Sequence, residues 1–279
     1  MKGIHPFAKR QVLTRKSANA TMPKLAACPS GGHVTNSRPE NVDMRSENPI
    51  ETVLFDFDGT LAFHEPDSFD VISSFCAEIG QPLSPEAERR GRRLRHEYFI
   101  DPVIREQLVG LSTEEFWRHF NRHTLEAFGI AGDLDLLAAK VTNRFDGLEL
   151  EYYCPEPGCQ TLAELSTRGY RLGLLTNREN VERLHVLVEQ LHLEGYFDMI
   201  LASGEVGIQK PDTGIFAIAL ERLGASAATS VYIGDNYWAD VVGAQRAGLT
   251  PILLDPYRLF PEAGCLILDQ IDDLLDWLP

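Results

Sequence analysis

Alternation of short apolar runs with helix-like segments, from residue 50 to the end of the chain, constrains the fold more than any other feature. The apolar runs occur at residues 53–57, 170–175, 199–202, 231–233, 251–254 and 266–268. Their almost continuous apolar character is typical of strands that are covered on both faces. Segments with helical periodicity lie between them, at residues 161–168, 180–193, 214–223 and 240–247. Strands that alternate with helices predict an α/β fold with a Rossmann-like parallel sheet.

Residues 66–148 interrupt this alternation. They follow the first predicted strand, and the segments 86–99 and 113–128 have the apolar spacing of helices. We therefore predict a small all-helical domain that is inserted after the first strand. The α/β core then consists of residues 49–65 and 149–279.

Residues 1–48 differ in composition from the rest of the chain. Residues 1–39 contain seven Lys or Arg and no Asp or Glu, although the whole chain of 279 residues has a net charge of −15. The segment is rich in small polar residues and has no regular apolar pattern, which predicts a disordered basic tail. Its composition also fits an organelle transit peptide. The five sparse cysteines indicate a reducing compartment, and we expect a cytoplasmic protein.

Charge and hydropathy exclude two classes of partner. The sequence has no run of about 18 uncharged apolar residues, so it predicts no membrane-spanning helix. A strongly acidic protein repels the phosphates of nucleic acids, so nucleic-acid binding is not expected. We expect a small-molecule substrate and either a monomer or a homodimer.

Polar side chains that suit phosphoryl transfer follow four of the predicted strands, and the carboxyl ends of parallel strands meet at one edge of the sheet. They are Asp56 and Asp58 at the end of the first strand, Thr176 and Asn177 after the second, Lys210 after the third, and Asp235 and Asp240 after the fourth. Clustered carboxylates need a cation, and oxygen ligands favour Mg²⁺. A carboxylate can act as a nucleophile, and a second one can transfer a proton. A hydroxyl group and an ammonium group can hold phosphoryl oxygens.

The order of these residues resembles the motifs of the haloacid-dehalogenase-like hydrolase superfamily, in the branch with a helical cap after the first motif. The matching segments are Asp56-Phe57-Asp58-Gly59-Thr60-Leu61, Leu174-Leu175-Thr176-Asn177, Lys210-Pro211, and Gly234-Asp235 through Asp240. The resemblance extends over about residues 50–279. It implies a Mg²⁺-dependent phosphomonoester hydrolase that acts on a small phosphorylated metabolite.

The resemblance also implies a role for each acid. Asp56 would attack phosphorus and form an aspartyl-phosphate, and Asp58 would protonate the leaving alcohol and then deprotonate water. Mg²⁺ would bind to the Asp56 carboxylate, the Asp58 backbone carbonyl and Asp235, with Asp240 as a further ligand.

The resemblance also implies that the remaining motif residues bind the phosphoryl oxygens, namely the Thr176 side chain, the Asn177 backbone amide and Lys210.

Three alternatives stay open: a 2-haloacid dehalogenase, a sugar phosphomutase on the same core, and a non-catalytic binding module. Dehalogenases of this superfamily lack the second acid of the first motif, so the presence of Asp58 favours a phosphatase. The intact motif acids argue against a binding module.

The sequence does not specify the phosphate ester. One predicted helix of the inserted domain carries five arginines, at positions 89, 90, 92, 93 and 95. Such a run is typical of a solvated basic face. The alternative is that one or two of these arginines bind an anionic group of the substrate.

Overall fold

The computed structural model describes residues 49–98, 101–108 and 110–278. The predicted basic tail, residues 1–48, lies outside the described residues.

The described residues form a six-stranded parallel sheet with the order β5-β4-β1-β6-β7-β8. The strands are β1 (Thr52–Phe55), β4 (Arg171–Thr176), β5 (Met199–Ala202), β6 (Ser230–Gly234), β7 (Thr250–Leu254) and β8 (Leu266–Leu268). Strand β1 lies between β4 and β6, and Phe55 is paired in register with Leu174 and Ile233. The residue after β1 therefore lies beside the ends of both neighbouring strands.

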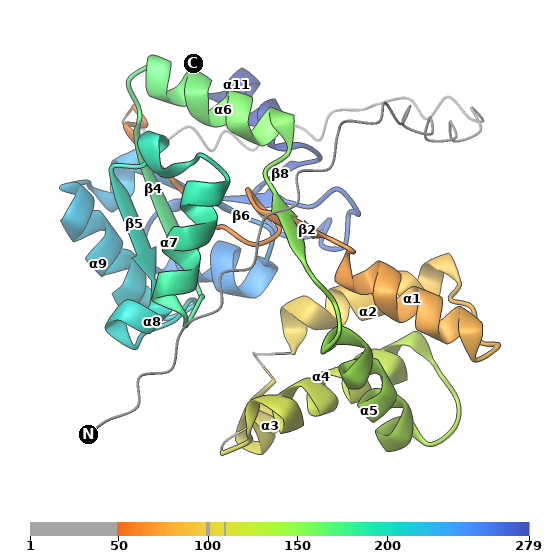
Figure 1. Ribbon diagram of the computed structural model, residues 1–279. Helices are drawn as coiled ribbons and strands as arrows, with labels where there is room; N and C mark the ends of the chain where they lie inside the picture. The colour runs from red at the N-terminus through yellow and green to blue at the C-terminus, as the bar shows by residue number, and fades with distance from the viewer. Residues whose placement is uncertain (1–48, 99–100, 109, 279) are drawn as a thin grey trace, which may run out of the picture. The chain divides into compact units, whose positions relative to one another are not determined.

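Helices cover both faces of the sheet, which explains why β1 is buried along its whole length (Figure 1). Successive strand residues point to opposite faces. Val53 and Phe55 therefore belong to one apolar cluster with α6 (Glu156–Thr167) and α7 (Val181–Gln190), whereas Leu54 belongs to another with α9 (Thr213–Leu223). The shorter helical elements are η1 (Glu194–Tyr196), α8 (Ser203–Val206), η2 (Ala227–Thr229), η3 (Tyr237–Val242), α10 (Gly243–Arg246), η4 (Ile271–Asp273) and α11 (Leu274–Trp277).

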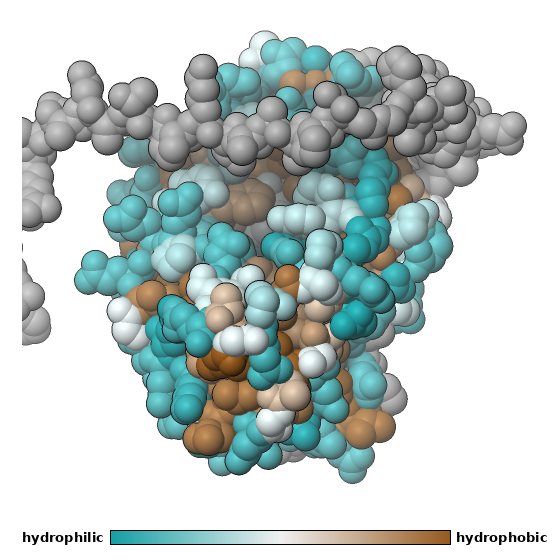
Figure 2. All heavy atoms as spheres, turned by 90° about the vertical axis from the view of Figure 1, so that its right-hand side faces the viewer, coloured by the Kyte–Doolittle hydropathy of each residue, from teal (hydrophilic) through white to brown (hydrophobic). Residues whose placement is uncertain are grey.

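A helical insertion, residues 68–145, lies between two short strands, β2 (Phe63–Glu65) and β3 (Glu151–Tyr153), which pair antiparallel. Its helices are α1 (Ser68–Glu78), α2 (Pro85–Glu97), α3 (Pro102–Gln107), α4 (Thr113–Phe128) and α5 (Leu134–Phe145). They have an apolar cluster of their own, in which Phe69 and Phe75 pack with Leu125 and Phe128. On the face shown in Figure 2, hydrophobic residues are interspersed among hydrophilic ones.

The predicted α/β class is confirmed, and each predicted strand overlaps an observed one. The prediction of a helix over residues 240–247 is wrong at its start. Asp240 lies inside the π-helical turn η3, whose N-cap is Asn236; the Asn236 side chain accepts hydrogen bonds from the backbone N–H groups of Trp238 and Ala239. The α-helix begins only at Gly243. Strands β2 and β3 were not predicted, since three residues give no clear alternation.

We expect Gly91→Ala to destabilise the protein by about 1–3 kcal/mol, the usual cost of overpacking. Gly91 lies in α2, and a β-carbon there would overlap the ring of Phe128 on α4. This clash opposes the gain of about 1 kcal/mol that alanine normally brings to a helix. Gly147→Ala is the control, because a β-carbon at Gly147 meets nothing within 4 Å. Urea unfolding of the two variants checks this, and an unchanged or higher stability of Gly91→Ala would contradict it.

Candidate active site

Three buried or half-buried carboxylates meet at the carboxyl edge of the sheet. Asp56 directly follows β1, Asp235 directly follows β6, and Asp240 comes from η3. One oxygen from each of the three lies within 4.8 Å of the others. We call this group the acid cluster. Its formation follows from the sheet order, since β1 and β6 are neighbours and end in register.

The Lys210 ammonium group lies against the acid cluster and is almost completely buried, with 4% of the residue exposed. Its Nζ donates hydrogen bonds to Asp56 Oδ1 (2.8 Å), Asp240 Oδ1 (2.7 Å) and the Tyr232 hydroxyl (2.7 Å). The Asn177 side chain fixes the Lys210 backbone, because it accepts from the Lys210 N–H (2.8 Å) and donates to the Lys210 carbonyl (3.0 Å). The loop after β4 therefore positions the lysine.

The acid cluster has more negative charge than Lys210 can balance. Burial raises the pKa of Asp56, Lys210 opposes this effect and Asp240 adds to it, and together they bring the pKa to about 7. Burial and the neighbouring carboxylates Asp56 and Asp240 hold the pKa of Asp235 well above its usual range. Burial alone lowers the pKa of Lys210, but Asp240 and Asp56 outweigh this effect and raise it. A group of oxygen donors with unbalanced negative charge fits a divalent cation such as Mg²⁺.

Two glycines leave room for these carboxylates. A β-carbon on Gly59 would lie 2.5 Å from Asp235 Oδ2, and one on Gly234 would overlap the Asp240 carboxylate. Gly59 also has a φ of +78°, a conformation that L-residues rarely adopt. The first and fourth motifs therefore require glycine for steric reasons.

Asp58 lies outside the acid cluster. Its exposed carboxylate accepts two hydrogen bonds from Arg178, at 2.8 Å from Nε and 2.6 Å from the terminal nitrogen. The guanidinium group of Arg178 also lies 5.3 Å from the ring centroids of both Phe57 and Tyr152. Arg178 was not among the predicted site residues, although its position directly after Thr176 and Asn177 indicates the same sheet edge.

The remaining predicted site residue, Thr176, is the last residue of β4 and is buried. The structure therefore brings Asp56, Asp235, Asp240 and Lys210 into contact range, and it places Thr176 and Asn177 at the end of the strand next to β1.

Helix α2 of the helical insertion contacts the core beside this edge. Arg89 donates hydrogen bonds to the carbonyls of Tyr257 (2.6 Å) and Arg258 (2.7 Å). His96 Nδ1 accepts a hydrogen bond from the backbone N–H of Tyr237 (3.3 Å), the second residue after Asp235. The C-terminal part of α2 therefore lies near the acid cluster.

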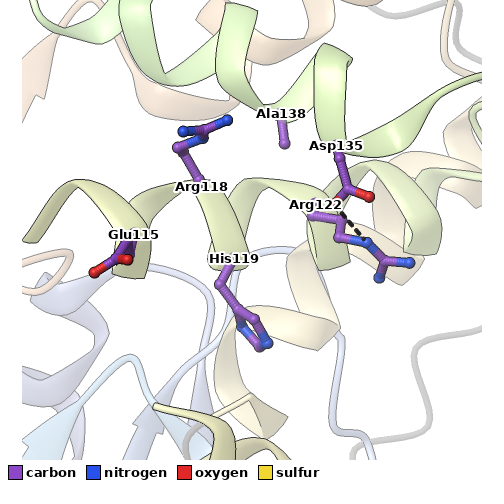
Figure 3. A pocket seen from close by; sticks show the side chains of 6 residues that line it. All are labelled: Glu115, Arg118, His119, Arg122, Asp135 and Ala138. Atoms are coloured by element: carbon purple, nitrogen blue, oxygen red, sulfur yellow. Dashed lines mark ion pairs between the residues drawn. The ribbon is translucent and has the colours of Figure 1, made fainter. Parts of the chain in front are cut away.

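A separate groove lies on the helical insertion, between α4 and α5 (Figure 3). It is lined by Glu115, Arg118, His119, Arg122, Asp135 and Ala138. Arg122 is paired with Asp135 across it (3.1 Å). The groove shares no residue with the acid cluster.

Comparison with known proteins supports the family that the motifs indicate. Residues 50–248 match the family model of haloacid dehalogenase-like hydrolases, and the chain belongs to this family. None of the helices in the described residues is both long and apolar enough to cross a membrane.

Curated relatives of similar length include two phosphatases. The chain is 28% identical to a glyceraldehyde 3-phosphate phosphatase of Methanothermobacter thermautotrophicus, over 81% of this chain and 96% of the relative. It is 31% identical to a ribulose-1,5-bisphosphate 5-phosphatase of Halopiger xanaduensis, over 73% and 84%. The structure also matches a putative hydrolase of this family from Bacillus subtilis, with a TM-score of 0.53, 21% identity, and coverage of 83% and 99%, which shows the shared fold. The family match and the phosphatase relatives together support a phosphoric monoester hydrolase.

We expect the contact of His96 with the core to make stability depend on pH. Burial, and then the charge of Arg95, lower the pKa of His96 from 6.5 to about 4. The unfolded chain takes up a proton at higher pH than the folded protein, so this contribution is complete above about pH 6.5 and is lost as the pH falls towards 4. The free energy of unfolding, measured with urea, should fall between pH 7 and pH 4.5. His96→Gln should make this fall smaller by about 1–3 kcal/mol. His185→Gln, at an exposed position on α7, should behave like the native protein. An equal fall in the free energy of unfolding for His96→Gln and the native protein would show that His96 does not cause this pH dependence.

Proposed function

We propose that the protein is a Mg²⁺-dependent phosphatase that hydrolyses a small phosphorylated metabolite through an aspartyl-phosphate on Asp56. The observation that carries this proposal is the acid cluster itself, in which three carboxylates surround one lysine ammonium group at the edge of the sheet. The two phosphatase relatives act, by their names, on phosphorylated sugars, and this supports a substrate of that size.

The residues that would hold Mg²⁺ are the acid cluster and the backbone carbonyl of Asp58. The fit rests on the donor chemistry, since carboxylate and carbonyl oxygens are the ligands that this ion prefers. When bound, Mg²⁺ would balance the charges of the carboxylates and of the phosphoryl oxygens.

Asp56 is the proposed nucleophile. Its Oδ1 accepts the hydrogen bond from Lys210, and within the described residues Oδ2 has no hydrogen-bond partner. Oδ2 is thus the oxygen that is free to attack phosphorus, with departure of the alcohol. Attack requires the ionised carboxylate, a form that the neighbouring ammonium group favours.

Asp58 is the proposed acid and base. It would donate a proton to the leaving alcohol and then remove one from the water that hydrolyses the aspartyl-phosphate. Arg178 now occupies both of its carboxylate oxygens, so this ion pair has to open before Asp58 can carry a proton. Thr176, the Asn177 backbone N–H and Lys210 would hold the phosphoryl oxygens.

The helical insertion is the proposed cap over this site, because α2 already contacts the segment that follows Asp235. A cytoplasmic location and a monomeric or homodimeric state stay predictions of the sequence analysis.

We expect phosphomonoesterase activity that depends on Mg²⁺. Turnover of a phosphomonoester panel, with p-nitrophenyl phosphate as the reference, should be lost in EDTA and restored by added Mg²⁺. Mg²⁺ should also raise the melting temperature, since it binds only the folded protein. Asp235→Asn should remove this rise, whereas Asp272→Asn, at an exposed position in η4, should retain it. Full activity in EDTA together with turnover of a 2-haloacid would support a dehalogenase instead.

We expect the two acids of the first motif to differ in their effect. Asp56→Asn should abolish turnover, because an amide is a poor nucleophile. Asp58→Asn should slow turnover by roughly 10²–10⁴, the usual contribution of a positioned acid or base. Steady-state kinetics with p-nitrophenyl phosphate measures both, and intact mass confirms that the introduced amide has not been hydrolysed back to the acid. An active, undeamidated Asp56→Asn variant would exclude Asp56 as the nucleophile.

A further inference from the structure

We infer that Arg95 on helix α2 binds a second anionic group of the substrate, a carboxylate or phosphate carried by the leaving alcohol. This inference rests on the proposed phosphatase function. The preferred substrates are then phosphate esters of alcohols that carry a carboxylate or a second phosphate. Arg95 is the residue of the helical insertion that selects them.

The other four arginines of α2 are already paired. Arg89 and Arg93 donate to backbone carbonyls of the core, Arg93 to that of Leu259 at 2.8 Å. Arg92 is paired with Glu88 (2.7 Å). Arg90 donates to the Ala127 carbonyl (3.0 Å) and also pairs with Glu86 within the insertion. The contacts of Arg89, Arg93 and Arg90 hold α2 against neighbouring elements, so the five arginines are not simply a solvated basic face.

Arg95 differs from these four in its surroundings. Within the described residues it makes no hydrogen bond and no ion pair; its guanidinium carbon lies 5.2 Å from the ring centroid of Phe69. The residue is exposed to water, and yet protein surrounds it closely enough that desolvation lowers its pKa. Arg95 is therefore a charged side chain that lies against Phe69, is reached by water, and has unused donors in the described residues.

Arg95 lies beside the acid cluster. The adjacent residue, His96, is hydrogen-bonded to Tyr237 just beyond Asp235. The charge of Arg95 interacts most strongly with Asp235, and also with Asp67 and Asp58. Asp235 is a proposed Mg²⁺ ligand, and the Asp67 carboxylate already caps α1 by accepting from the Phe69 and Asp70 N–H groups.

The other cations near the site have anionic partners. Lys210 is bound to Asp56 and Asp240, and Arg178 is bound to Asp58. Among the cations that interact with the acids of this sheet edge, Arg95 is thus the one whose donors are unused in the described part of the chain. A guanidinium group binds carboxylate or phosphate through two parallel hydrogen bonds. A leaving alcohol extends away from Asp56, towards the elements that face the sheet edge, and α2 is such an element.

The test compares two esters that differ in one group. 3-Phosphoglycerate carries a carboxylate where glycerol 3-phosphate carries a neutral CH₂OH group. Binding is measured by calorimetry with Mg²⁺ in the Asp56→Asn protein, where the proposed nucleophile is absent and turnover does not interfere. The measurement is then repeated with double variants, in which Arg95→Ala, Arg95→Lys or Arg90→Ala is added to Asp56→Asn. Arg90 is the matched control, because its contacts lie within the insertion.

We expect Arg95→Ala to weaken binding of 3-phosphoglycerate by about 10–100-fold and of glycerol 3-phosphate by less than about threefold, as for the loss of a hydrogen bond to a charged group. Arg95→Lys should retain part of the preference, and Arg90→Ala should retain all of it. Equal losses for both esters, no loss, or no binding of either ester would overturn the inference. The proposed function fails separately, if the native protein hydrolyses no phosphomonoester in Mg²⁺.

Discussion

Repulsion among three carboxylates at one sheet edge is the constraint on which the rest of the site depends. Burial of such groups is costly unless a cation lies between them. Lys210 supplies one positive charge. The Asn177 side chain holds Lys210 in place through hydrogen bonds to the backbone N–H and carbonyl of Lys210. Because Asn177 directly follows β4 and Asp56 directly follows β1, the pairing of these strands is what fixes the charge balance. The remaining negative charge is the reason why we propose that the site binds a divalent ion.

The sequence predicted the parts of this arrangement that follow from strand order. Asp56 and Asp235 each lie at the end of an apolar run, and parallel strands end at one edge, so their meeting could be predicted. The position of Asp240 in a π-helical turn could not, because that turn is set by the Asn236 cap and not by apolar spacing. The pairing of Arg178 with Asp58 was also missed, since it depends on side-chain orientations after two different strands.

The arginines of α2 differ in their contacts, and we propose two different tasks for them. On α2, Arg89 and Arg93 bond to core carbonyls and thereby fix the helix relative to the sheet edge. Arg95, less than about two helical turns beyond Arg89, lies next to that edge without a partner in the described residues. Charge spacing in the sequence could not separate these roles, because all five arginines lie within seven positions. In our proposal the chemistry comes from the core, and the contact with the leaving alcohol comes from the insertion.

The antiparallel pair β2 and β3 has a consequence for how this chain can change over evolutionary time. The pairing of Phe63 with Tyr153 and of Glu65 with Glu151 brings the chain back to the place where it left the core. The described residues between these strands thus form an insertion that has its own apolar cluster and contacts the core through α2. Exchange of that insertion for one of another length or shape leaves the register of the sheet untouched. If the insertion contacts the leaving alcohol, as we propose, selection on the insertion alters the substrate while the sheet is inherited unchanged.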